Sequence, residues 1–298
     1  MLTSDQIAEL KAKINGRRVV ASVSGGKDSA AMSLYLTELG IEHDRVFMDT
    51  GWEHPDTYKY LRGALTEKLG PIHEVRSAKY PKGMPQMVVE RGTFPSRIRR
   101  LCTTELKIYP MRDYIQRRQD AGEELISVVG IRRAESEARS RMPEWEWNNE
   151  LDLEVWRPLI LWSEQDVIDI HHRHGLPPNP LYLRGEGVQR VGCWPCIFSR
   201  KAEIKQVAEQ TPERIELIAQ LEQQVAEEVH RKYRERGEVY EGQAPSFFYG
   251  HLVQSAVAWS KTAQGGKQFE LFAAGERDAG CMRWGLCETN PDKGGSNE

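Results

Sequence analysis

Short apolar runs alternate with longer amphipathic stretches along the first half of the chain. Apolar runs bounded by turn residues are typical of strands buried on both faces, and they predict β-strands at 18–23, 44–48, 72–75 and 125–131. Stretches with apolar residues on one helical face predict helices at 4–15, from about 27 to 39, and at 103–119. This alternation predicts an α/β fold, in which a parallel sheet is covered by helices on both faces.

The later part of the chain has a helical pattern. Ser163 predicts the N-cap of one helix. From 201 to about 236 the residues are mostly Ala, Glu, Gln, Lys, Arg and Leu, which predicts one or two long helices broken near Pro212. We therefore expect an α/β domain over 1–200 and a mainly helical C-terminal extension over 201–298 that contributes cysteines.

The strand at 18–23 runs directly into a glycine-rich turn and then into a helix. Glycines let the backbone turn its N–H groups toward an anion, the lysine adds a positive charge, and the following helix N-terminus adds the positive end of its dipole. An ordinary strand-to-helix turn does not need all of these features, so the pattern predicts a phosphate-binding loop. The residues expected to hold a nucleotide are Ser24, Gly25, Gly26, Lys27, Asp28 and Ser29.

Further polar residues follow the other predicted strands. Ligands of parallel sheets bind beyond the carboxyl ends of the strands, so we expect Ser24, Asp49 and Arg132 to face one crevice, with Gly130 beside the nucleotide. The planar guanidinium of Arg132 suits a phosphate or sulfonate group. Asp28 and Asp49 are the acidic candidates for a Mg²⁺ ion bridging phosphates, and each also suits a helix cap or a strand-end turn.

Composition and charge limit the class of protein. The 298 residues carry a formal net charge of -3 and a mean hydropathy of -0.60, and no run approaches the length of a membrane span. The chain does not begin with a basic and then apolar segment, so we expect a cytoplasmic protein without a membrane partner. Its mildly acidic charge gives no overall attraction to nucleic acid, so a nucleic-acid acceptor would need a local basic patch or a partner subunit.

The five cysteines are the remaining candidates for chemistry. Without an export signal they argue against disulfides and for metal, redox or buried-thiol roles. Cys193 and Cys196 form a C-x-x-C pair, whose spacing suits two ligands of one metal or cluster. Cys102, Cys281 and Cys287 are the further thiols, so four ligands can be assembled in more than one way. The set predicts a metal centre, either an iron–sulfur cluster or a structural Zn²⁺ ion.

Several motifs occur in one order between about residues 15 and 200. They are Ser-Gly-Gly-Lys-Asp-Ser at 24–29, Asp-Thr-Gly at 49–51 with Pro-Asp-Thr at 55–57, Cys102 with Lys107 and Pro110, Gly-Ile-Arg-Arg at 130–133, Asn-Pro-Leu-Tyr at 179–182 and Gly-Cys-Trp-Pro-Cys at 192–196. In this order they resemble the phosphoadenosine-phosphosulfate reductase family of the PP-loop ATP pyrophosphatase superfamily. The resemblance implies a Rossmann-like adenine nucleotide alpha-hydrolase fold that binds ATP or an adenylylated sulfonucleotide.

The resemblance also implies a ligand set for a cluster. In iron–sulfur members of this family, a Cys-Cys pair before a Lys-x-x-Pro and a later Gly-Cys-x-x-Cys hold a [4Fe-4S] cluster. Cys102, Cys193 and Cys196 match three of these positions, and Thr103 stands at the fourth. The last ligand is then a C-terminal cysteine, with Cys287 the first choice, or one iron is open to sulfide or substrate.

The same fold and cluster resemble the DndC-type and SspD-type proteins of DNA phosphorothioation and some tRNA thiolases. The implied function is an ATP-dependent iron–sulfur sulfurtransferase that forms AMP and pyrophosphate and activates an acceptor, such as a nucleic acid, for thiolation. A cysteine desulfurase or another donor would supply the sulfide. The residues expected to carry the chemistry are Lys27, Asp28, Asp49, Lys107, Arg132 and Cys281.

Two alternatives remain open. The first is a thioredoxin-linked reductase of adenylylsulfate or phosphoadenylylsulfate, with Cys281 or Cys287 as the nucleophile. The tail at 280–288 has letters similar to the Glu-Cys-Gly-Leu-His motif of the reductases, but in a different order. The second alternative is a non-catalytic nucleotide-sensing subunit of a defence or modification complex, with the helices after residue 200 as its interface.

Overall fold

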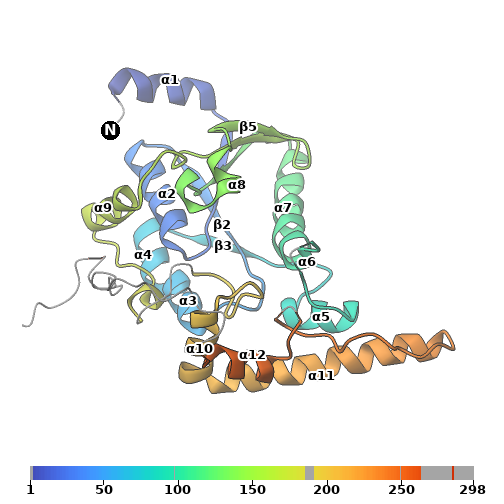
Figure 1. Cartoon of the computed structure of the whole chain (residues 1–298). Coiled ribbons are helices and arrows are strands. Elements are labelled where there is room, and N and C mark those ends of the chain that lie inside the picture. Colours follow the sequence, from blue (N-terminus) through green and yellow to red (C-terminus); the bar gives the residue numbers. More distant parts are fainter. Residues whose placement is uncertain (1–2, 97, 185–190, 249, 263–283, 285–298) are drawn as a thin grey trace, which may run out of the picture.

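A computed structural model describes residues 3–96, 98–184, 191–248, 250–262 and 284. Within these residues, a six-stranded sheet has the strand order β3-β2-β1-β4-β6-β5 (Figure 1). Neighbouring strands are parallel except for β5, which runs antiparallel to β6. The strands are β1 (Arg18–Ser22), β2 (His43–Met48), β3 (Ile72–Val75), β4 (Leu125–Val129), β5 (Trp145–Asn148) and β6 (Leu153–Trp156).

Helices cover both faces of the sheet, with α2 and α9 on one face and α7 on the other (Figure 1). The helices are α1 (Ser4–Ile14), α2 (Lys27–Glu38), α3 (Pro55–Tyr60), α4 (Thr66–Leu69), α5 (Met84–Arg91), α6 (Leu101–Thr103), α7 (Tyr109–Gln119), α8 (Glu137–Ser140), α9 (Glu164–His174), α10 (Lys201–Gln210), α11 (Pro212–Glu235) and α12 (Val253–Ser260). Short π-helical stretches at Leu61–Leu65 and Thr104–Ile108 and 3-10 turns at Arg133–Glu135 and Pro180–Leu183 complete the helical segments.

The side chains of the central strand divide between two cores. Val19 and Ala21 of β1 face the core that is shared with α2 and α9, whereas Val20 faces the core that contains Met111 and Ile115 of α7. Successive side chains of a strand point to opposite faces of a sheet. A strand covered on both sides therefore needs a continuous apolar run, which is the pattern that this sequence shows.

A further core lies beside the sheet, where α10, α11 and α12 pack near α5 (Figure 1). It combines Trp52 and Met87 from the first part of the chain with Ile218 and Phe247 from the later part. Glu222 of α11 is buried in this region, and its carboxylate accepts the backbone N–H of Phe247 at 2.9 Å. The C-terminal helices therefore share an apolar core with the α/β part of the chain.

The predicted fold class is confirmed, because a mainly parallel Rossmann-like α/β sheet is followed by a mainly helical C-terminal region. Pro212 begins α11, so the break between two helices lies where it was expected. The predicted strand at 125–131 ends earlier, at Val129. The β5–β6 hairpin was missed, and its antiparallel strand makes the sheet mixed. The division at residue 200 stays a prediction. In the part of the chain that the structure describes, no helix is long and apolar enough to cross a membrane.

Candidate active site

The glycine-rich loop lies between β1 and α2. Gly25 has a φ of +74°, and a Cβ atom there would lie 3.0 Å from Cγ2 of Thr57, so glycine is required. The Ser29 hydroxyl donates to the Gly26 carbonyl at 2.9 Å and accepts the Ser24 N–H at 3.1 Å. These bonds close a tight turn onto the N-terminus of α2, which is the geometry expected of a phosphate-binding loop.

Buried side chains from α9 and the segment after it hold the loop. Asn179 donates its Nδ2 to the Gly25 carbonyl at 3.1 Å, and the Lys27 N–H donates to the Tyr182 hydroxyl at 3.2 Å. His171 Nε2 lies 3.0 Å from the Lys27 carbonyl, and burial lowers the pKa of His171. Sequence reasoning assigned no role in the site to these three residues, although Asn179 and Tyr182 belong to one of the motifs.

Asp28 and Arg132 form an ion pair next to the glycine-rich loop. The Arg132 guanidinium donates through Nε to the Asp28 carboxylate, and both side chains are largely buried. The two segments approach closely because Gly130 has no side chain: a Cβ there would lie 2.7 Å from the Asp28 carbonyl oxygen and 3.1 Å from Cβ of Met32. The Arg132 N–H donates to Glu135 at 2.7 Å, which fixes the backbone. The structure thus brings together Asp28, Gly130 and Arg132, and their roles at a nucleotide stay predictions.

Lys27 completes this charged group. Its side chain is only 7% exposed, and Nζ lies 3.3 Å from the carboxylate of Glu164 on α9 and 3.9 Å from that of Asp28. Arg133 lies apart from this group, because it is exposed and donates to the Met142 carbonyl at 3.3 Å. The group behind the loop therefore contains one lysine, one arginine and their carboxylate partners.

Asp49 follows β2 and anchors the next turn. Its buried carboxylate accepts the Gly51 N–H at 2.8 Å, the Tyr58 hydroxyl at 2.6 Å and Nε of Arg76 at 2.8 Å. The Tyr58 oxygen also lies 3.0 Å from Oε2 of Glu53, so the two carboxylates share its single hydrogen. Burial, followed by the charges of Glu53 and Asp49, raises the pKa of Tyr58, so the phenol keeps its proton. Asp49 is therefore a buried turn residue with an arginine as its partner, and its place in one crevice with Ser24 and Arg132 stays a prediction.

The thiols lie beside this turn. The Thr50 hydroxyl is 3.9 Å from Sγ of Cys193, and Glu53 forms a backbone bridge with Cys193. The negative charge of Cys193 is the main cause of a raised pKa for Lys107. Burial, followed by the charge of Cys193, raises the pKa of the Cys102 thiol, whereas Lys107 lowers it. Cys102, Cys193 and Lys107 therefore share one electrostatic environment next to the Asp49 turn.

Distant residues fix the C-x-x-C loop. The Trp194 N–H donates to the Trp52 carbonyl at 2.8 Å, and the Trp52 indole N–H donates to the Pro195 carbonyl at 3.0 Å. Arg214 of α11 donates to the Trp194 carbonyl at 2.6 Å, and its guanidinium lies 3.6 Å from the centre of a Trp52 ring. Sγ of Cys196 accepts a backbone N–H at 3.5 Å. The helical C-terminal region thus helps to position the thiols.

The metal predictions are not settled by this geometry. Cys281 and Cys287 lie outside the described residues, and their roles stay predictions. Among the residues that the structure describes, no group of three or more His, Cys, Asp or Glu side chains is arranged to hold a metal ion. Glu53 and Arg76 are site residues that sequence reasoning missed. For Glu53 the signal was its place in the motif that begins at Asp49, and for Arg76 it was its place directly after the predicted strand at 72–75.

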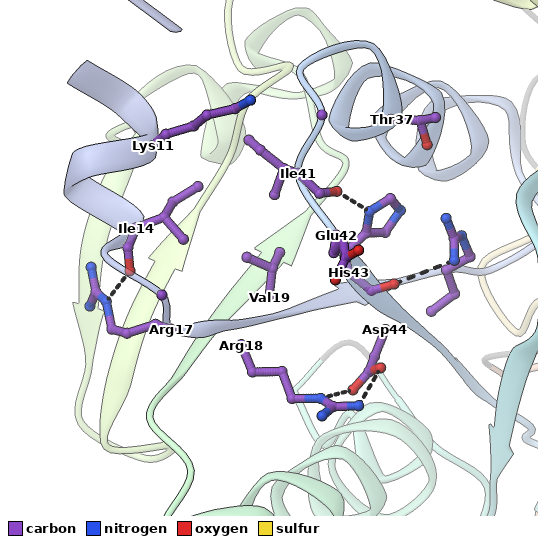
Figure 2. A pocket seen from close by; sticks show the side chains of 13 residues that line it. Lys11, Ile14, Arg17, Arg18, Val19, Thr37, Ile41, Glu42, His43 and Asp44 are labelled. Carbon is purple, nitrogen blue, oxygen red and sulfur yellow. Dashed lines mark hydrogen bonds and ion pairs between the residues drawn. The ribbon is translucent and has the colours of Figure 1, made fainter. Parts of the chain in front are cut away.

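A cavity of about 970 Å³ lies at the amino ends of β1 and β2, away from the glycine-rich loop (Figure 2). There the Arg18 guanidinium donates to both carboxylate oxygens of Asp44, at 2.6 and 2.9 Å, and Nε of Arg17 donates to the Ile14 carbonyl at 3.1 Å. Burial lowers the pKa of His43 in this cavity to about 4. This cavity lies at the amino ends of the strands, whereas ligands of parallel sheets bind beyond the carboxyl ends, so we expect the nucleotide at the other end.

The fold and the site together define a class of protein, namely a Rossmann-like α/β protein with a PP-type phosphate loop after its first strand and thiols beside the turn that follows its second strand. A family model described as the phosphoadenosine phosphosulfate reductase domain matches residues 18–199, which is more than half of the chain. The chain belongs to the phosphoadenosine phosphosulfate reductase family. It is accordingly a PP-loop enzyme of this reductase type.

The chain is also similar to individual proteins. The chain is 32% identical to an uncharacterized 37.8 kDa protein of Escherichia phage 186, and the match covers 90% of this chain and 96% of that protein. It is 34% identical to an adenosine 5′-phosphosulfate reductase of Allochromatium vinosum, over 60% of this chain and 69% of the reductase. A crystal structure of phosphoadenylyl-sulfate reductase from Candida auris, in a phosphate complex, is 16% identical, covers 65% of this chain and 97% of that chain, and has a TM-score of 0.47.

Proposed function

We propose that the protein reduces an adenylylated sulfonucleotide, with adenosine 5′-phosphosulfate as the first substrate to test. One observation favours this function over ATP cleavage. Asp28 is paired with Arg132 and Lys27, and Asp49 is paired with Arg76 and bonded to Tyr58. Both acidic candidates for a Mg²⁺ ion therefore already have cationic partners. Arginine and lysine side chains, rather than a metal ion, would then bind the phosphate and sulfonate groups of a sulfonucleotide.

The named residues have separate tasks in this proposal. The glycine-rich loop and Lys27 bind the phosphate, and Arg132 orients it by charge-assisted hydrogen bonds. Lys107 lies among the thiols and stabilises negative charge on the sulfonate. The name of the Allochromatium vinosum relative supports this substrate class, because that protein is called an adenosine 5′-phosphosulfate reductase.

The sulfur chemistry needs a nucleophile and a reductant. In the proposed first step the thiolate of Cys281 attacks the sulfonate sulfur, an S–S bond forms, the S–O bond to the nucleotide breaks, and AMP leaves with that electron pair. A thiolate of reduced thioredoxin then attacks the sulfur of Cys281, and sulfite leaves with the electron pair of the S–S bond. The second thioredoxin thiol closes the thioredoxin disulfide and returns Cys281 as a thiolate, so the two electrons come from thioredoxin.

Cys102, Cys193 and Cys196 have the donor chemistry of an iron–sulfur cluster, because thiolates hold such clusters and two of these three form a C-x-x-C pair. They are therefore the residues that would hold a [4Fe-4S] cluster, with Cys287 as a fourth ligand. When bound, a cluster would supply electrostatic stabilisation next to Lys107. Iron and acid-labile sulfide assays on anaerobically purified protein test this part, and stoichiometric zinc without labile sulfide would favour a structural zinc site instead.

The reaction is tested with adenosine 5′-phosphosulfate, phosphoadenylylsulfate, thioredoxin, thioredoxin reductase and NADPH under anaerobic conditions. We expect sulfite to form at a rate that Arg132→Ala lowers at least about 100-fold, since a transition-state contact with a charged donor is lost. Arg133→Ala is the matched control, because the neighbouring arginine lies apart from the site. Cys281→Ser should abolish sulfite release. Sulfite formation that survives this change would rule out the covalent step.

A second candidate, the ATP-dependent sulfurtransferase, is supported by Thr103. This residue lies beside Cys102 at a position where a cluster ligand would be expected, so an open iron could bind sulfide from a cysteine desulfurase. An acceptor would then be adenylated by ATP and thiolated, and a nucleic-acid acceptor would reach the site through a partner subunit. Formation of AMP and pyrophosphate from ATP, with no sulfite from either sulfonucleotide, would select this function. Nucleotide binding without either reaction would select the nucleotide-sensing subunit.

A further inference from the structure

Two exposed aromatic side chains lie beside cations on the surface next to the C-x-x-C loop. Phe198 is 38% exposed, and Cζ of the Arg100 guanidinium lies 5.6 Å from the centre of its ring. Trp259 of α12 is 39% exposed, and Nζ of Lys201 lies 5.1 Å from the centre of one of its rings. Aromatic rings of this size are mostly buried in folded proteins. These two rings are instead accessible platforms, each with a positive charge beside it.

The two ring–cation pairs are neighbours in the fold. Phe198 precedes Lys201 by only three residues, and Lys201 begins α10. α10 packs against α12, and Nζ of Lys201 donates to the carbonyl of Thr262, which follows α12. These contacts join the residues before α10 to the end of α12. We call the set the basic aromatic surface, and it comprises Arg99, Arg100, Phe198, Arg200, Lys201 and Trp259.

The basic aromatic surface carries an excess of positive charge. Arg99 and Arg100 are both exposed, and neither forms an ion pair with the residues that the structure describes. Of the acidic residues near the surface in the chain, Glu105 is buried in an ion pair, and Glu203 accepts the backbone N–H of Arg200 at 2.7 Å. Both carboxylates therefore have partners already, which leaves the two exposed arginines available to an anion.

Backbone hydrogen bonds hold both parts of this surface in place. The Ser96 N–H donates to the Arg99 carbonyl at 2.9 Å, and the Arg99 N–H donates to the Ser96 hydroxyl at 3.0 Å. The Phe198 N–H donates to Sγ of Cys196 at 3.5 Å, and the Ser199 N–H donates to the carbonyl of the same cysteine at 2.9 Å. The arginines and the ring are therefore held on fixed turns, one of which continues the C-x-x-C loop.

Rings interleaved with cations provide the chemistry that recognises a single-stranded nucleic acid. Its unpaired bases stack on aromatic side chains, and its phosphates bind arginine and lysine. The bases of a duplex are already stacked inside it, so exposed rings have less to bind there. The chain as a whole has a formal net charge of -3, so a nucleic-acid partner needs a local basic patch. The basic aromatic surface supplies that patch.

We propose that the basic aromatic surface binds single-stranded nucleic acid, with bases stacked on Phe198 and Trp259 and phosphates bound by Arg99 and Arg100. DNA and RNA share this chemistry, and the experiment distinguishes them. The inference goes beyond the proposed function, because it needs no turnover of a sulfonucleotide. A protein that binds a single strand but releases no sulfite would contradict only the proposed reduction. One that releases sulfite but binds no strand would contradict only this inference.

Fluorescence anisotropy tests the surface with labelled dodecathymidylate, labelled dodecauridylate and a labelled DNA duplex of the same length. Each probe is titrated at several salt concentrations, since phosphate contacts make the affinity salt-dependent. Phe198→Leu and Trp259→Leu each remove one ring and keep an apolar side chain. Arg99→Ala/Arg100→Ala removes two exposed charges. Circular dichroism confirms that the variants are folded.

We expect each ring variant to bind the single strands at least about fivefold more weakly than the unmodified protein, because one base loses its stacking partner. The double arginine variant should also bind more weakly. Its slope of log affinity against log salt should be shallower by about 1.4, since each phosphate contact with a single strand contributes about 0.7. The single strand that the unmodified protein binds more tightly identifies DNA or RNA as the partner.

Arg234→Ala/Arg236→Ala is the matched control. Both arginines are exposed, and Cζ of Arg236 lies 5.9 Å from the centre of the Tyr233 ring, so this pair also combines charge with an aromatic neighbour. α11 extends away from α10 (Figure 1), and Arg234 lies roughly 33 Å along the helix from Pro212. The control variant should therefore keep the affinity of the unmodified protein for every probe.

Several outcomes would overturn the proposal. They are unchanged affinity in either ring variant, an unchanged salt slope in the double arginine variant, and an equal loss in the control variant. Binding of the duplex as tightly as the single strands, or no binding of either single strand by the unmodified protein, would also overturn it.

Discussion

Gly130→Ala is a one-carbon change that should separate the glycine-rich loop from the arginine behind it. The new Cβ would lie 2.7 Å from the Asp28 carbonyl oxygen, 3.1 Å from its carbonyl carbon and 3.1 Å from Cβ of Met32. Ordinary contact begins at 3.4 Å, so α2 and the end of β4 must move apart by about 0.7 Å. The nearest atoms belong to backbone, and a rotamer change cannot relieve the contact.

We expect Gly130→Ala to lower both the stability of the fold and the affinity for a nucleotide. Overpacking of this kind costs about 1–3 kcal/mol of unfolding free energy, and the displacement also disturbs the ion pair between Asp28 and Arg132. Urea unfolding followed by tryptophan fluorescence measures the stability, and titration with 5′-AMP measures the affinity. We expect a loss of about 2 kcal/mol in stability and at least about tenfold in affinity.

Gln224→Ala is the control, because Gln224 is an exposed residue of α11 outside the loop, and such surface substitutions usually change stability by less than about 0.5 kcal/mol. A Gly130→Ala protein that kept its stability within about 0.5 kcal/mol and its affinity within about twofold of the unmodified protein would refute the close approach of β4 and α2.

Further substitutions test other parts of the structure. Glu222→Ala should cost about 2–4 kcal/mol in urea unfolding, because the buried N–H groups of Phe247 and Val253 lose their acceptor, whereas Glu222→Gln keeps an acceptor oxygen and should cost less than half as much. The unfolded chain protonates histidine near pH 6.5 but folded His43 only near pH 4, so protons favour unfolding. Stability should fall by about 3 kcal/mol between these pH values, and His43→Gln should lack this part of the fall in urea midpoints at pH 7 and 4.5. Tyr182→Phe removes the hydroxyl that accepts the Lys27 N–H, so this N–H can donate to a bound phosphate instead. Titration should therefore show about twofold to tenfold tighter 5′-AMP binding. Weaker binding would show that the hydroxyl itself contacts the nucleotide.

The parts of the fold that were predicted from sequence depend on local patterns. The strand at 18–23, the glycine-rich turn and α2 follow each other without interruption, so periodicity and turn chemistry locate them. The β5–β6 hairpin has the same kind of signal in Leu153-Glu154-Val155-Trp156, with apolar and polar residues alternating at first. The hairpin was missed because β5 is short and partly exposed. Its residues form a strand because they pair with β6, and their composition alone does not indicate one.

Sequence reasoning named residues of the glycine-rich loop and residues that follow two of the strands, and it missed residues that act through a distant partner. Asp49 and Arg132 were found because their strands end beside β1. Arg76 reaches Asp49 only because β3 pairs with β2 in a register that sets Met48 opposite Val75. Arg214 reaches the C-x-x-C loop from α11 through tertiary packing alone. Strand register and tertiary packing cannot be derived from a single sequence, so such partners cannot be predicted from it.

The Asp49 turn joins the two halves of the site through one hydrogen atom. The oxygen of Tyr58 lies 2.6 Å from Oδ1 of Asp49 and 3.0 Å from Oε2 of Glu53, but a phenol can donate only one hydrogen bond. Arg76 holds Asp49 by an ion pair, while Glu53 forms a backbone bridge with Cys193. Asp49 and Glu53 therefore compete for the single hydrogen of Tyr58, and the shorter distance favours Asp49 as its acceptor. Tyr58 thus links the Arg76–Asp49 pair to the carboxylate that lies beside Cys193.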